Sequence, residues 1–411
     1  MKPLRKKIYA AAGYNSIFFG TGRKEFNPKK PMPTFEMYLK EAAEGTCAQL
    51  QSRDFDEGVI SNTMAPRFLK QANIPGFLPF AVPTLKGKPC TATEGACGSG
   101  GRGLAAAARS ILSDEANAVY VTGFEIQNNL KAVYGADILS SAGYYCKERK
   151  DGYAHFFPGV FAERAGAYYE KYGAEDARRG MAKWYELSIL NARKNSKAQE
   201  YHNSTEDLFA LGMTPPSAER FVPHLNVFDC SKVSDGASSI ALFSEEGLAK
   251  FGVKKEDCVE IVGIGASQGD ITQKPGDLTY MENNAAAASK ALEQAGIKKE
   301  DLALLELHDC FTITALLVLE SLGFAERGKG AHFLLDGGTA IDSTIPTNLS
   351  GGLCGFGHPV GVSGVRQLVD LLHQFTGKAE NPALIEKPYG MLVSMGGNDI
   401  TVTSVVVKKA S

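Results

Sequence analysis

The sequence lacks the features that define several classes of protein. Its eight cysteines include no Cys-x-x-Cys pair among 411 residues, which is too few for a disulfide scaffold and is typical of a reducing cytoplasm. No apolar run reaches the length of a membrane span. The segment after Lys7 is too short and too polar for the apolar core of a signal peptide. A net charge of -2 gives no reason to expect nucleic acid as a partner. We therefore expect a cytoplasmic protein that contacts neither membrane nor nucleic acid.

What the chain does contain is an alternation of predicted strands and helices, which is typical of an α/β protein with a parallel sheet. The first half predicts strands at 7–13, 54–61 and 117–123, helices at 34–51 and 65–72, and a surface loop at 75–88. Thr34 is the expected N-cap of the first long helix. The length allows two or three domains.

The second half repeats this order. It predicts strands at 258–265, 302–307, 391–394 and 400–407 and helices at 280–295 and 363–375. The Ser-Gly-Val-Arg segment at 363–366 matches Ser-Gly-Gly-Arg at 99–102, and each begins a helix. Two similar halves should pack as a pseudo-twofold pair, with these helix N-termini facing each other across the seam. We therefore expect one site that both halves share.

The repeat also predicts domain boundaries. A first half at 1–124, completed by about 223–250, is followed by a second half at 251–411, and an inserted region at 125–222 lies between them. This region is rich in aromatic pairs and in basic residues such as Arg193, Lys194 and Lys197. Such a lobe can hold a nucleotide-bearing ligand by stacking and phosphate pairing. The alternative is a helical cap whose aromatic residues are its own core.

Cys97 stands among small residues directly before a strong helix-forming run. The positive end of a helix dipole favours thiolate, the form that attacks carbonyl groups. We therefore expect Cys97 to be the most reactive of the eight thiols. The alternative is a small buried cysteine beside glycines that permit close helix packing.

Three further stretches carry polar groups suited to chemistry. His308 and Cys310 follow a predicted strand, His358 precedes the helix that mirrors the Cys97 helix, and Gly396 lies in a glycine pair at the end of another strand. A lone histidine is usually a surface or satisfied core residue, and a glycine-rich turn is usually only a turn. The repeat, however, places all four stretches at equivalent ends of one sheet.

Together these motifs resemble the thiolase superfamily, most closely its sterol-carrier-protein-type branch, and the resemblance covers nearly the whole chain. It implies the thiolase fold, in which two α/β halves form five layers (αβαβα) and carry an inserted loop domain that binds coenzyme A. It also implies that Cys97 is the nucleophile that becomes acylated and that His358 activates it. His308 would bind the thioester oxygen.

The resemblance assigns two further roles. Most thiolases carry a second cysteine where this chain has Ser394, and in the sterol-carrier branch the acid/base cysteine comes from the His-Asp-Cys-Phe motif, which points to Cys310. The backbone N–H groups of Cys97 and Gly396 would form the oxyanion hole. For coenzyme A, the implied ligands are the cations Arg193, Lys194 and Lys197.

The implied activity is CoA-dependent cleavage of a 3-oxoacyl-CoA through an acyl-cysteine enzyme. The Glu-Gly-Ala segment at 94–96 and the Gly-Val-Ser-Gly segment at 361–364 depart from the usual motifs near the reacting acyl group. Residues 14–26 and the turn at Glu94 resemble thiolases that convert 2-benzoylsuccinyl-CoA to benzoyl-CoA and succinyl-CoA in anaerobic toluene degradation. The alternatives are an acetoacetyl-CoA thiolase, a decarboxylating ketosynthase and a non-catalytic scaffold subunit. Cys310 argues against the ketosynthase, which needs no second thiol.

The same resemblance implies the partners. Coenzyme A is a substrate, and neither a tightly bound cofactor nor a metal is expected, since the chain has no zinc-ligand spacing. A homodimer and a small zinc-ribbon and OB-fold partner protein are implied.

Overall fold

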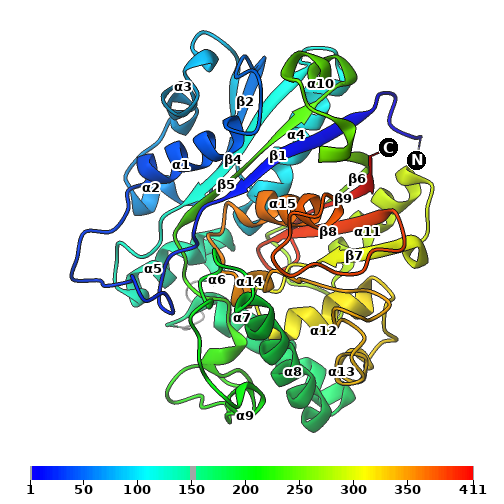
Figure 1. Ribbon diagram of the computed structural model, residues 1–411. Helices are drawn as coiled ribbons and strands as arrows, with labels where there is room; N and C mark the ends of the chain where they lie inside the picture. Colours follow the sequence, from blue (N-terminus) through cyan, green and yellow to red (C-terminus); the bar gives the residue numbers. More distant parts are fainter. Residues whose placement is uncertain (1, 149–153, 411) are drawn as a thin grey trace.

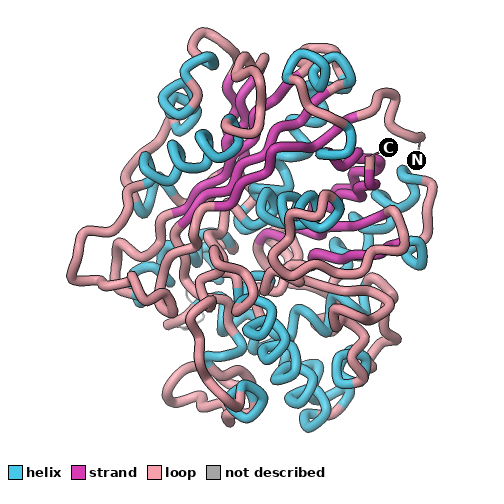
Figure 2. The backbone as a smooth tube through the Cα atoms, in the orientation of Figure 1, coloured by secondary structure: helices cyan, strands magenta, loops and turns pink. Residues whose placement is uncertain are grey.

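The computed structural model describes residues 2–148 and 154–410. Within these residues, nine strands form one hydrogen-bonded sheet in the order β3-β2-β4-β5-β1-β6-β9-β8-β7 (Figures 1 and 2). The strands are β1 (Ile8–Asn15), β2 (Glu57–Ser61), β3 (Cys90–Thr93), β4 (Ala118–Glu125), β5 (Gly236–Phe243), β6 (Cys258–Gln268), β7 (Leu302–Glu306), β8 (Tyr389–Gly396) and β9 (Thr401–Lys409).

The strand order contains the predicted repeat. β2 runs parallel to β3 and β4, and β5 is antiparallel to β4 and β1. In the second half β7 runs parallel to β8, and β9 is antiparallel to β8 and β6. The counterpart of β3 is reduced to one parallel bridge between Leu305 and Thr347. Antiparallel pairing of β1 with β6, from Ile8 opposite Ile261 to Ala11 opposite Cys258, joins the two half-sheets.

The helices complete five layers, which confirms the predicted fold class (Figure 1). One outer layer packs on the first half-sheet and consists of α1 (Phe35–Cys47), α3 (Leu78–Ala81) and α10 (Glu245–Phe251). The central layer is α4 (Ser99–Leu112) with α15 (Ser363–Phe375). The other outer layer is α11 (Glu282–Ala295), α12 (Thr312–Ser321) and α13 (Gly330–Leu335). The remaining helices are α2 (Ala65–Phe68), α5 (Ala132–Leu139), α6 (Tyr145–Glu148), α7 (Phe156–Tyr172), α8 (Ala174–Ala192), α9 (Leu208–Gly212) and α14 (Gly352–Gly355).

The two central helices are buried because each carries apolar residues at positions i, i+3, i+4 and i+7, which form one continuous stripe. In α4 these residues are Leu104, Ala107, Ala108 and Ile111. In α15 they are Val365, Leu368, Val369 and Leu372. Both stripes join a single core with strands of both half-sheets. The central layer therefore packs against both halves at once.

Glycine brings the N-termini of these two helices into backbone contact. A Cβ on Gly364 would lie 2.2 Å from the backbone nitrogen of Gly101, and a Cβ on Gly100 would lie 2.8 Å from that of Gly364. No larger residue fits at this seam without moving a helix. The contact sets the Cys97 turn beside the segment that carries His358, as the repeat predicted.

Several element boundaries differ from the predictions. The 75–88 segment is no surface loop, because it holds three short helical turns, each with proline in its first two positions, and buries Leu78, Val82 and Leu85. The helix predicted at 34–51 ends at Cys47, and its N-cap Thr34 makes no side-chain capping hydrogen bond. The helix predicted at 65–72 ends at Phe68. The short edge strand β3 was not predicted.

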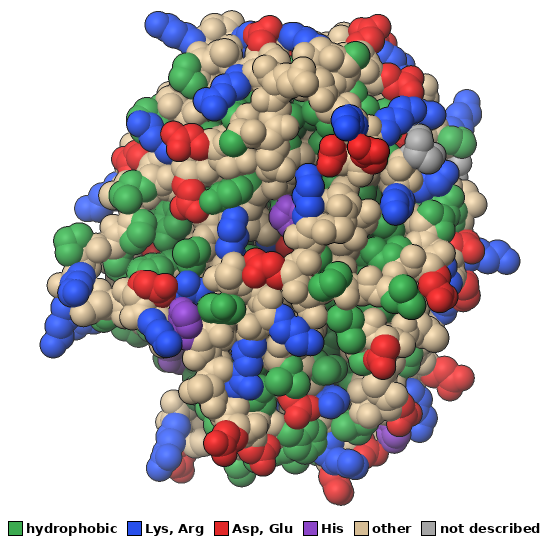
Figure 3. Space-filling view, viewed as in Figure 1, with side chains coloured by type: hydrophobic (Ala, Val, Ile, Leu, Met, Phe, Trp, Pro, Cys, Tyr) green, Lys and Arg blue, Asp and Glu red, His purple; other side chains and the backbone are tan. Residues whose placement is uncertain are grey.

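In the inserted region, α7 and α8 pack against the second half, whereas α5 packs against Met64 and Phe68 of the first half (Figure 1). Tyr168 and Trp184 belong to the same buried core as α12, and the indole of Trp184 donates a hydrogen bond to Asp309 (3.1 Å). These two rings fit the alternative interpretation, in which the aromatic residues of the region form a core. Acidic and basic side chains are interspersed on the face in Figure 3. Within the described ranges, no helix is both long and apolar enough to cross a membrane.

Candidate active site

Cys97 lies in a tight turn (Ala96–Gly98) at the start of α4. Side chains fix the backbone of this turn. The Ser99 hydroxyl donates to the carbonyl of Ala96 (2.6 Å) and accepts from the N–H of Gly95 (3.0 Å), while Glu94 accepts from the N–H of Ala96 (2.7 Å). Ala96 has a φ of 53°, which is unusual for a residue with a side chain. The turn therefore holds the thiol in one place against local backbone strain.

His308 and His358 meet at this thiol. The Cys97 sulfur and one ring nitrogen from each histidine lie within 4.8 Å of one another. The rings are nearly perpendicular, with centroids 5.2 Å apart. Both histidines are buried, and among the described residues neither Nε2 atom has a hydrogen-bond partner. Two unpartnered ring nitrogens beside a sulfur are poised for a reacting group, because buried polar atoms are otherwise almost always paired.

Hydrogen bonds at the opposite ring nitrogens set the two tautomers differently. The Nδ1 of His308 accepts from the backbone N–H of Met395 (3.4 Å), so its Nε2 carries the hydrogen and is a donor. The Nδ1 of His358 lies 2.7 Å from the hydroxyl of Ser363, which can accept a hydrogen from it and leave Nε2 as a base. The same residue type can therefore supply a donor and a base in one site.

Both imidazoles are neutral near pH 7. Burial lowers the pKa of His358 to about 3, and the guanidinium of Arg366 acts in the same direction. Burial, His358 and Arg366 lower the pKa of His308 well below its usual value. Arg366 is itself fully buried and pairs with Glu306 and Asp370. A buried cation behind the site thus favours a base that is free of its proton before substrate arrives.

The thiol of Cys97 does not behave as the sequence predicted. Burial raises its pKa to about 12, and the carboxylate of Glu125 adds to this effect. The N–H groups of Cys97 and Gly397 oppose it but do not overcome it. The expectation that the helix N-terminus makes Cys97 a ready thiolate is therefore wrong for the free enzyme. Attack by Cys97 requires that its proton pass to a neighbour such as His358.

This correction reverses the expected order of alkylation. Iodoacetamide at pH 7 should label the exposed Cys146 before Cys97. Labelling of Cys97 should rise ~10-fold per pH unit from pH 7 to 9, because the thiolate fraction grows tenfold per unit below the pKa. Peptide mapping after timed alkylation measures both rates. A plateau for Cys97 below pH 8 would show instead that the thiol is already ionised.

Glu125 is a site residue that sequence reasoning missed. It is fully buried at the end of β4, where its carboxylate accepts from the N–H groups of Thr63 (2.9 Å), Met64 (3.1 Å) and Gly361 (3.1 Å). Burial raises its pKa to about 7. Glu125 thereby ties the turn after β2 to the loop that carries His358. An acidic residue at the end of an apolar strand, at the edge where α/β sheets bind ligands, was the available signal.

A cavity of 440 Å³ opens onto this cluster. Cys97, Cys310 and His358 line it, together with Cys230 and Gly397. Its walls are rich in phenylalanine, namely Phe26, Phe68, Phe156, Phe157, Phe161, Phe221 and Phe311. Four of these belong to the inserted region and the other three to segments far apart in the sequence. The cavity is therefore suited to a large apolar group held beside the Cys97 thiol.

The second predicted thiol and the predicted oxyanion donor are both near this cavity. Cys310 is buried, and its pKa is raised well above the usual value by burial and by nearby Cys97. Gly396 packs on the Cys97 turn so closely that a Cβ would lie 1.9 Å from the carbonyl oxygen of Gly95. From the glycine pair, the N–H group that contacts the Cys97 sulfur belongs to Gly397, beside the N–H of Cys97 itself.

The structure does not bring the predicted coenzyme-binding cations to the cavity. Arg193 donates to Asn203 (3.2 Å) and to the carbonyl of Thr205 (2.5 Å). The ammonium of Lys197 lies 3.5 Å from the centre of the Tyr14 ring. Lys194 is exposed, and none of the three cations lines the cavity. Basic spacing in the sequence could not distinguish cations that bind a ligand from cations that hold loops together.

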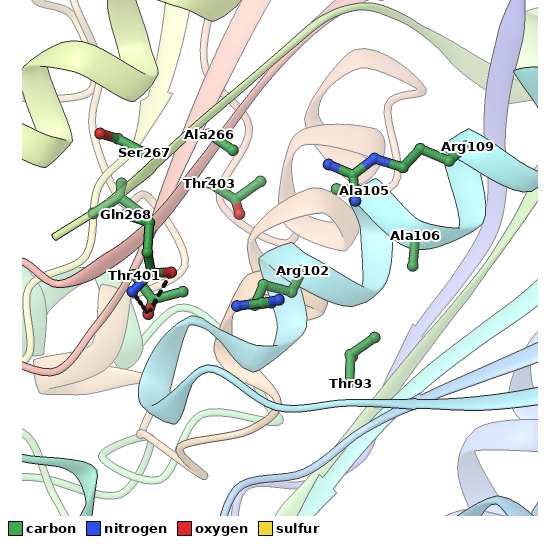
Figure 4. Close-up of a pocket in the computed structure, with 11 residues that line it drawn as sticks. Thr93, Arg102, Ala105, Ala106, Arg109, Ala266, Ser267, Gln268, Thr401 and Thr403 are labelled. Carbon is green, nitrogen blue, oxygen red and sulfur yellow. Dashed lines mark hydrogen bonds between the residues drawn. The ribbon is translucent and has the colours of Figure 1, made fainter. Parts of the chain in front are cut away.

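A second pocket, of 250 Å³, lies along α4 next to β6 and β9 (Figure 4). Arg102 and Arg109 project from α4 toward it, and Gln268 forms a hydrogen bond with Thr401 at its edge. Both arginines are exposed, and Arg102 covers the backbone of Gly95 just before the Cys97 turn. Thr93, the last residue of the edge strand β3, also lines this pocket.

Known proteins are similar to this chain in sequence. A family model described as Thiolase C-terminal domain-like matches residues 263–409. The acetyl-CoA acetyltransferase of Methanocaldococcus jannaschii is 30% identical over 361 residues, covering 86% of this chain and 88% of the relative. The benzoylsuccinyl-CoA thiolase subunit BbsB of Thauera aromatica is 26% identical over 377 residues, covering 90% and 89%.

Solved structures agree with these matches in fold. An Ltp2-ChsH2(DUF35) aldolase superposes with a TM-score of 0.78 at 18% identity, covering 99% of this chain and 98% of that chain. Human mitochondrial 3-ketoacyl-CoA thiolase in complex with CoA superposes with a TM-score of 0.71 at 17% identity, covering 100% and 99%. The sequence matches, which extend over most of the chain, and the shared five-layered fold confirm the resemblance that the motifs indicated: this chain belongs to the thiolase superfamily of acyltransferases.

Proposed function

We propose that this acyltransferase cleaves a bulky aromatic 3-oxoacyl-CoA with coenzyme A, and that its substrate is 2-benzoylsuccinyl-CoA, giving benzoyl-CoA and succinyl-CoA. The observation that carries the proposal is the phenylalanine-lined cavity of 440 Å³ beside Cys97. A substrate that presented only an acetyl group would leave most of this apolar surface unfilled. The match to the Thauera aromatica subunit over most of both chains supports the same substrate.

In the proposed mechanism, His358 takes the proton of Cys97 as the sulfur attacks the 3-oxo carbonyl. Collapse of the adduct breaks the bond between the α and β carbons and leaves an acyl-cysteine and the enolate of the CoA thioester. The Nε2–H of His308 stabilises the enolate oxygen, and Cys310 protonates the enolate carbon. The Cys310 thiolate then takes the proton of incoming coenzyme A, whose sulfur attacks the acyl-cysteine. Cys97 leaves as a thiolate and recovers its proton from His358.

Backbone donors complete the proposed site. The N–H groups of Cys97 and of the glycine pair Gly396 and Gly397 stabilise the tetrahedral oxyanions, an effect typically worth ~3 kcal/mol per donor. The inserted region at 125–222 supplies part of the cavity wall, which supports its assignment as the loop domain that covers coenzyme A. The chemistry needs no tightly bound cofactor and no metal, since coenzyme A is the second substrate.

An acetyl-CoA acetyltransferase is the second candidate. Two relatives of that name, at 30% and 28% identity, cover most of this chain and are more identical to it than the benzoylsuccinyl-CoA thiolase subunit, at 26%. A non-catalytic scaffold subunit is disfavoured, because such a subunit has no need to keep Cys97 and two unpartnered imidazoles together.

We also propose two protein partners. A homodimer is supported by the position of β3 at the edge of the sheet and by the adjoining pocket with its two exposed arginines (Figure 4). A small zinc-ribbon and OB-fold protein is supported by the Ltp2-ChsH2(DUF35) aldolase, a structural relative in which Ltp2 is joined with a DUF35 protein. Analytical ultracentrifugation of the chain, alone and mixed with a DUF35 protein, measures both assemblies.

The substrate proposal is tested by turnover. The purified protein should cleave 2-benzoylsuccinyl-CoA with a kcat/KM at least ~100-fold above that for acetoacetyl-CoA, because only the aromatic thioester fills the cavity and gains its burial energy. Stopped-flow absorbance of the CoA products measures both reactions. Equal use of the two thioesters would favour the acetyltransferase, and turnover of neither would favour the scaffold.

A further inference from the structure

Lys232 is distinctive among the described residues that line the cavity. Of these residues it alone is a lysine, arginine, aspartate or glutamate. A buried ammonium needs a partner, and that of Lys232 is held by Glu200 at 3.7 Å and by the Phe228 ring at 5.9 Å. The side chain is largely buried, with 25% of its surface exposed.

Backbone contacts hold Lys232 between the segments that carry the candidate catalytic groups. Cys230 forms a bridge with Phe311, and the N–H of Ser231 donates to the carbonyl of Cys310 (2.9 Å). On the other side, Val233 forms a bridge with His358. The three residues around Lys232 are thus tied to the strand end with Cys310 and to the loop with His358. The backbone on both sides of Lys232 is therefore anchored to the two segments that carry candidate catalytic groups.

The N–H donors of the Lys232 ammonium are not used in hydrogen bonds among the described residues. Its nearest carboxylate oxygen is the Oε1 of Glu200 at 3.7 Å, which is beyond hydrogen-bond distance. The other oxygen of Glu200 is occupied by the amide of Asn203 (2.8 Å). No hydrogen bond from Lys232 is present within the described part of the chain. Glu200 therefore orients the lysine without saturating it.

We propose that Lys232 binds a free carboxylate on the acyl chain, so that the cavity selects dicarboxylic aromatic 3-oxoacyl-CoA thioesters over neutral ones. This inference rests on the proposed function, since it names the group by which that substrate is recognised. The phenylalanine walls hold the ring, and Lys232 supplies the charge-assisted hydrogen bonds that a buried carboxylate requires. Coenzyme A also carries anionic phosphates, so the test must separate the two anions.

Two substrates that differ only in the carboxylate side chain make that separation. 2-Benzoylsuccinyl-CoA carries it, and benzoylacetyl-CoA has the same aromatic ketone and coenzyme without it. Lys232→Gln should raise KM for the first by ~10- to 100-fold and change KM for the second and for coenzyme A less than twofold. Lys232→Arg should restore most of the loss. The matched control is Lys254→Gln, which removes an exposed lysine that also lies beside a carboxylate, that of Glu256.

A binding experiment keeps the inference testable if the protein turns over neither thioester, an outcome that would remove only the proposed function. 2-Benzylsuccinyl-CoA and 3-phenylpropanoyl-CoA lack the 3-oxo group and cannot be cleaved. Calorimetry should show at least tenfold tighter binding of the first to the native protein, and Lys232→Gln should abolish this preference. Equal weakening of both ligands would place a CoA phosphate at Lys232. An unchanged preference would exclude contact with either anion. Both results would overturn the proposal.

Discussion

Replacement of His358 by alanine is expected to lower kcat/KM by ~10⁴-fold, because, of the two described imidazoles beside Cys97, only His358 presents a ring nitrogen that is free to accept the thiol proton. With a pKa of about 12, the thiol is almost entirely protonated near pH 7. His358 is free of its proton at that pH and lies in the same 4.8 Å cluster. Steady-state kinetics with the preferred thioester measure the loss.

A variant that lacks both Cys97 and His358 tests whether the two residues act together. Residues that act as one unit give strongly non-additive losses, so Cys97→Ala with His358→Ala should be no slower than Cys97→Ala alone. His332→Ala is the control, because His332 is exposed and pairs with Asp176 at the surface. If the His358→Ala enzyme kept more than a tenth of native activity, or if the two losses multiplied, His358 would not be the base.

Cys310→Ala is expected to separate the two halves of the reaction. Overall thiolysis should fall ~10²- to 10⁴-fold, since the enolate and the incoming coenzyme lose their acid/base group. Acylation of Cys97 by a simple activated thioester should survive, because Cys97 and His358 remain in place. Rapid-quench mass spectrometry of the acyl-enzyme, beside steady-state turnover, measures the two steps.

Cys354 and Cys230 provide the controls for the Cys310→Ala experiment. Cys354 is buried next to the same segment, where its thiol contacts the carbonyl of Asp309 (3.0 Å), but it does not line the cavity. Cys354→Ala should therefore lose a little stability and keep its turnover. Cys230 does line the cavity. Near-normal turnover by Cys310→Ala together with a collapse in Cys230→Ala would transfer the acid/base role to Cys230.

The sequence predicted the architecture well because its signals were repeated. The helix at 363–375 was predicted with its observed bounds, and the predicted strands follow one another along the chain as expected. The expectation of a parallel sheet was wrong, because β1, β5, β6 and β9 pair antiparallel with their neighbours and make the sheet mixed. Short elements escaped prediction for a physical reason. β3 and α3 have four residues each, which is too short a stretch for a repeating hydrophobic pattern to identify a strand or a helix.

The sequence predicted correctly which groups meet at one edge of the sheet. It did not predict properties that depend on long-range packing, namely the pKa of the Cys97 thiol and the cations that reach the cavity. Motif positions brought Cys97, His308 and His358 together, as expected. The sequence could not show that burial outweighs the helix dipole at Cys97, because that depends on how neighbouring segments exclude water. Nor could it show which cations reach the cavity. Lys232 does, whereas Arg193 is committed to a loop.

The glycine seam between α4 and α15 has a consequence for how this molecule can diversify. The backbone contact of Gly364 with Gly101, rather than any side chain, sets how far apart the nucleophile and base segments stand. The phenylalanine walls come from other segments, so residues there can change in size while that spacing stays constant. Different residues therefore determine which acyl group is bound and how the nucleophile and the base are spaced. Substitution of single wall residues can therefore change the acyl group that fits the cavity. A side chain at Gly101 or Gly364, in contrast, would require the two helices to move apart.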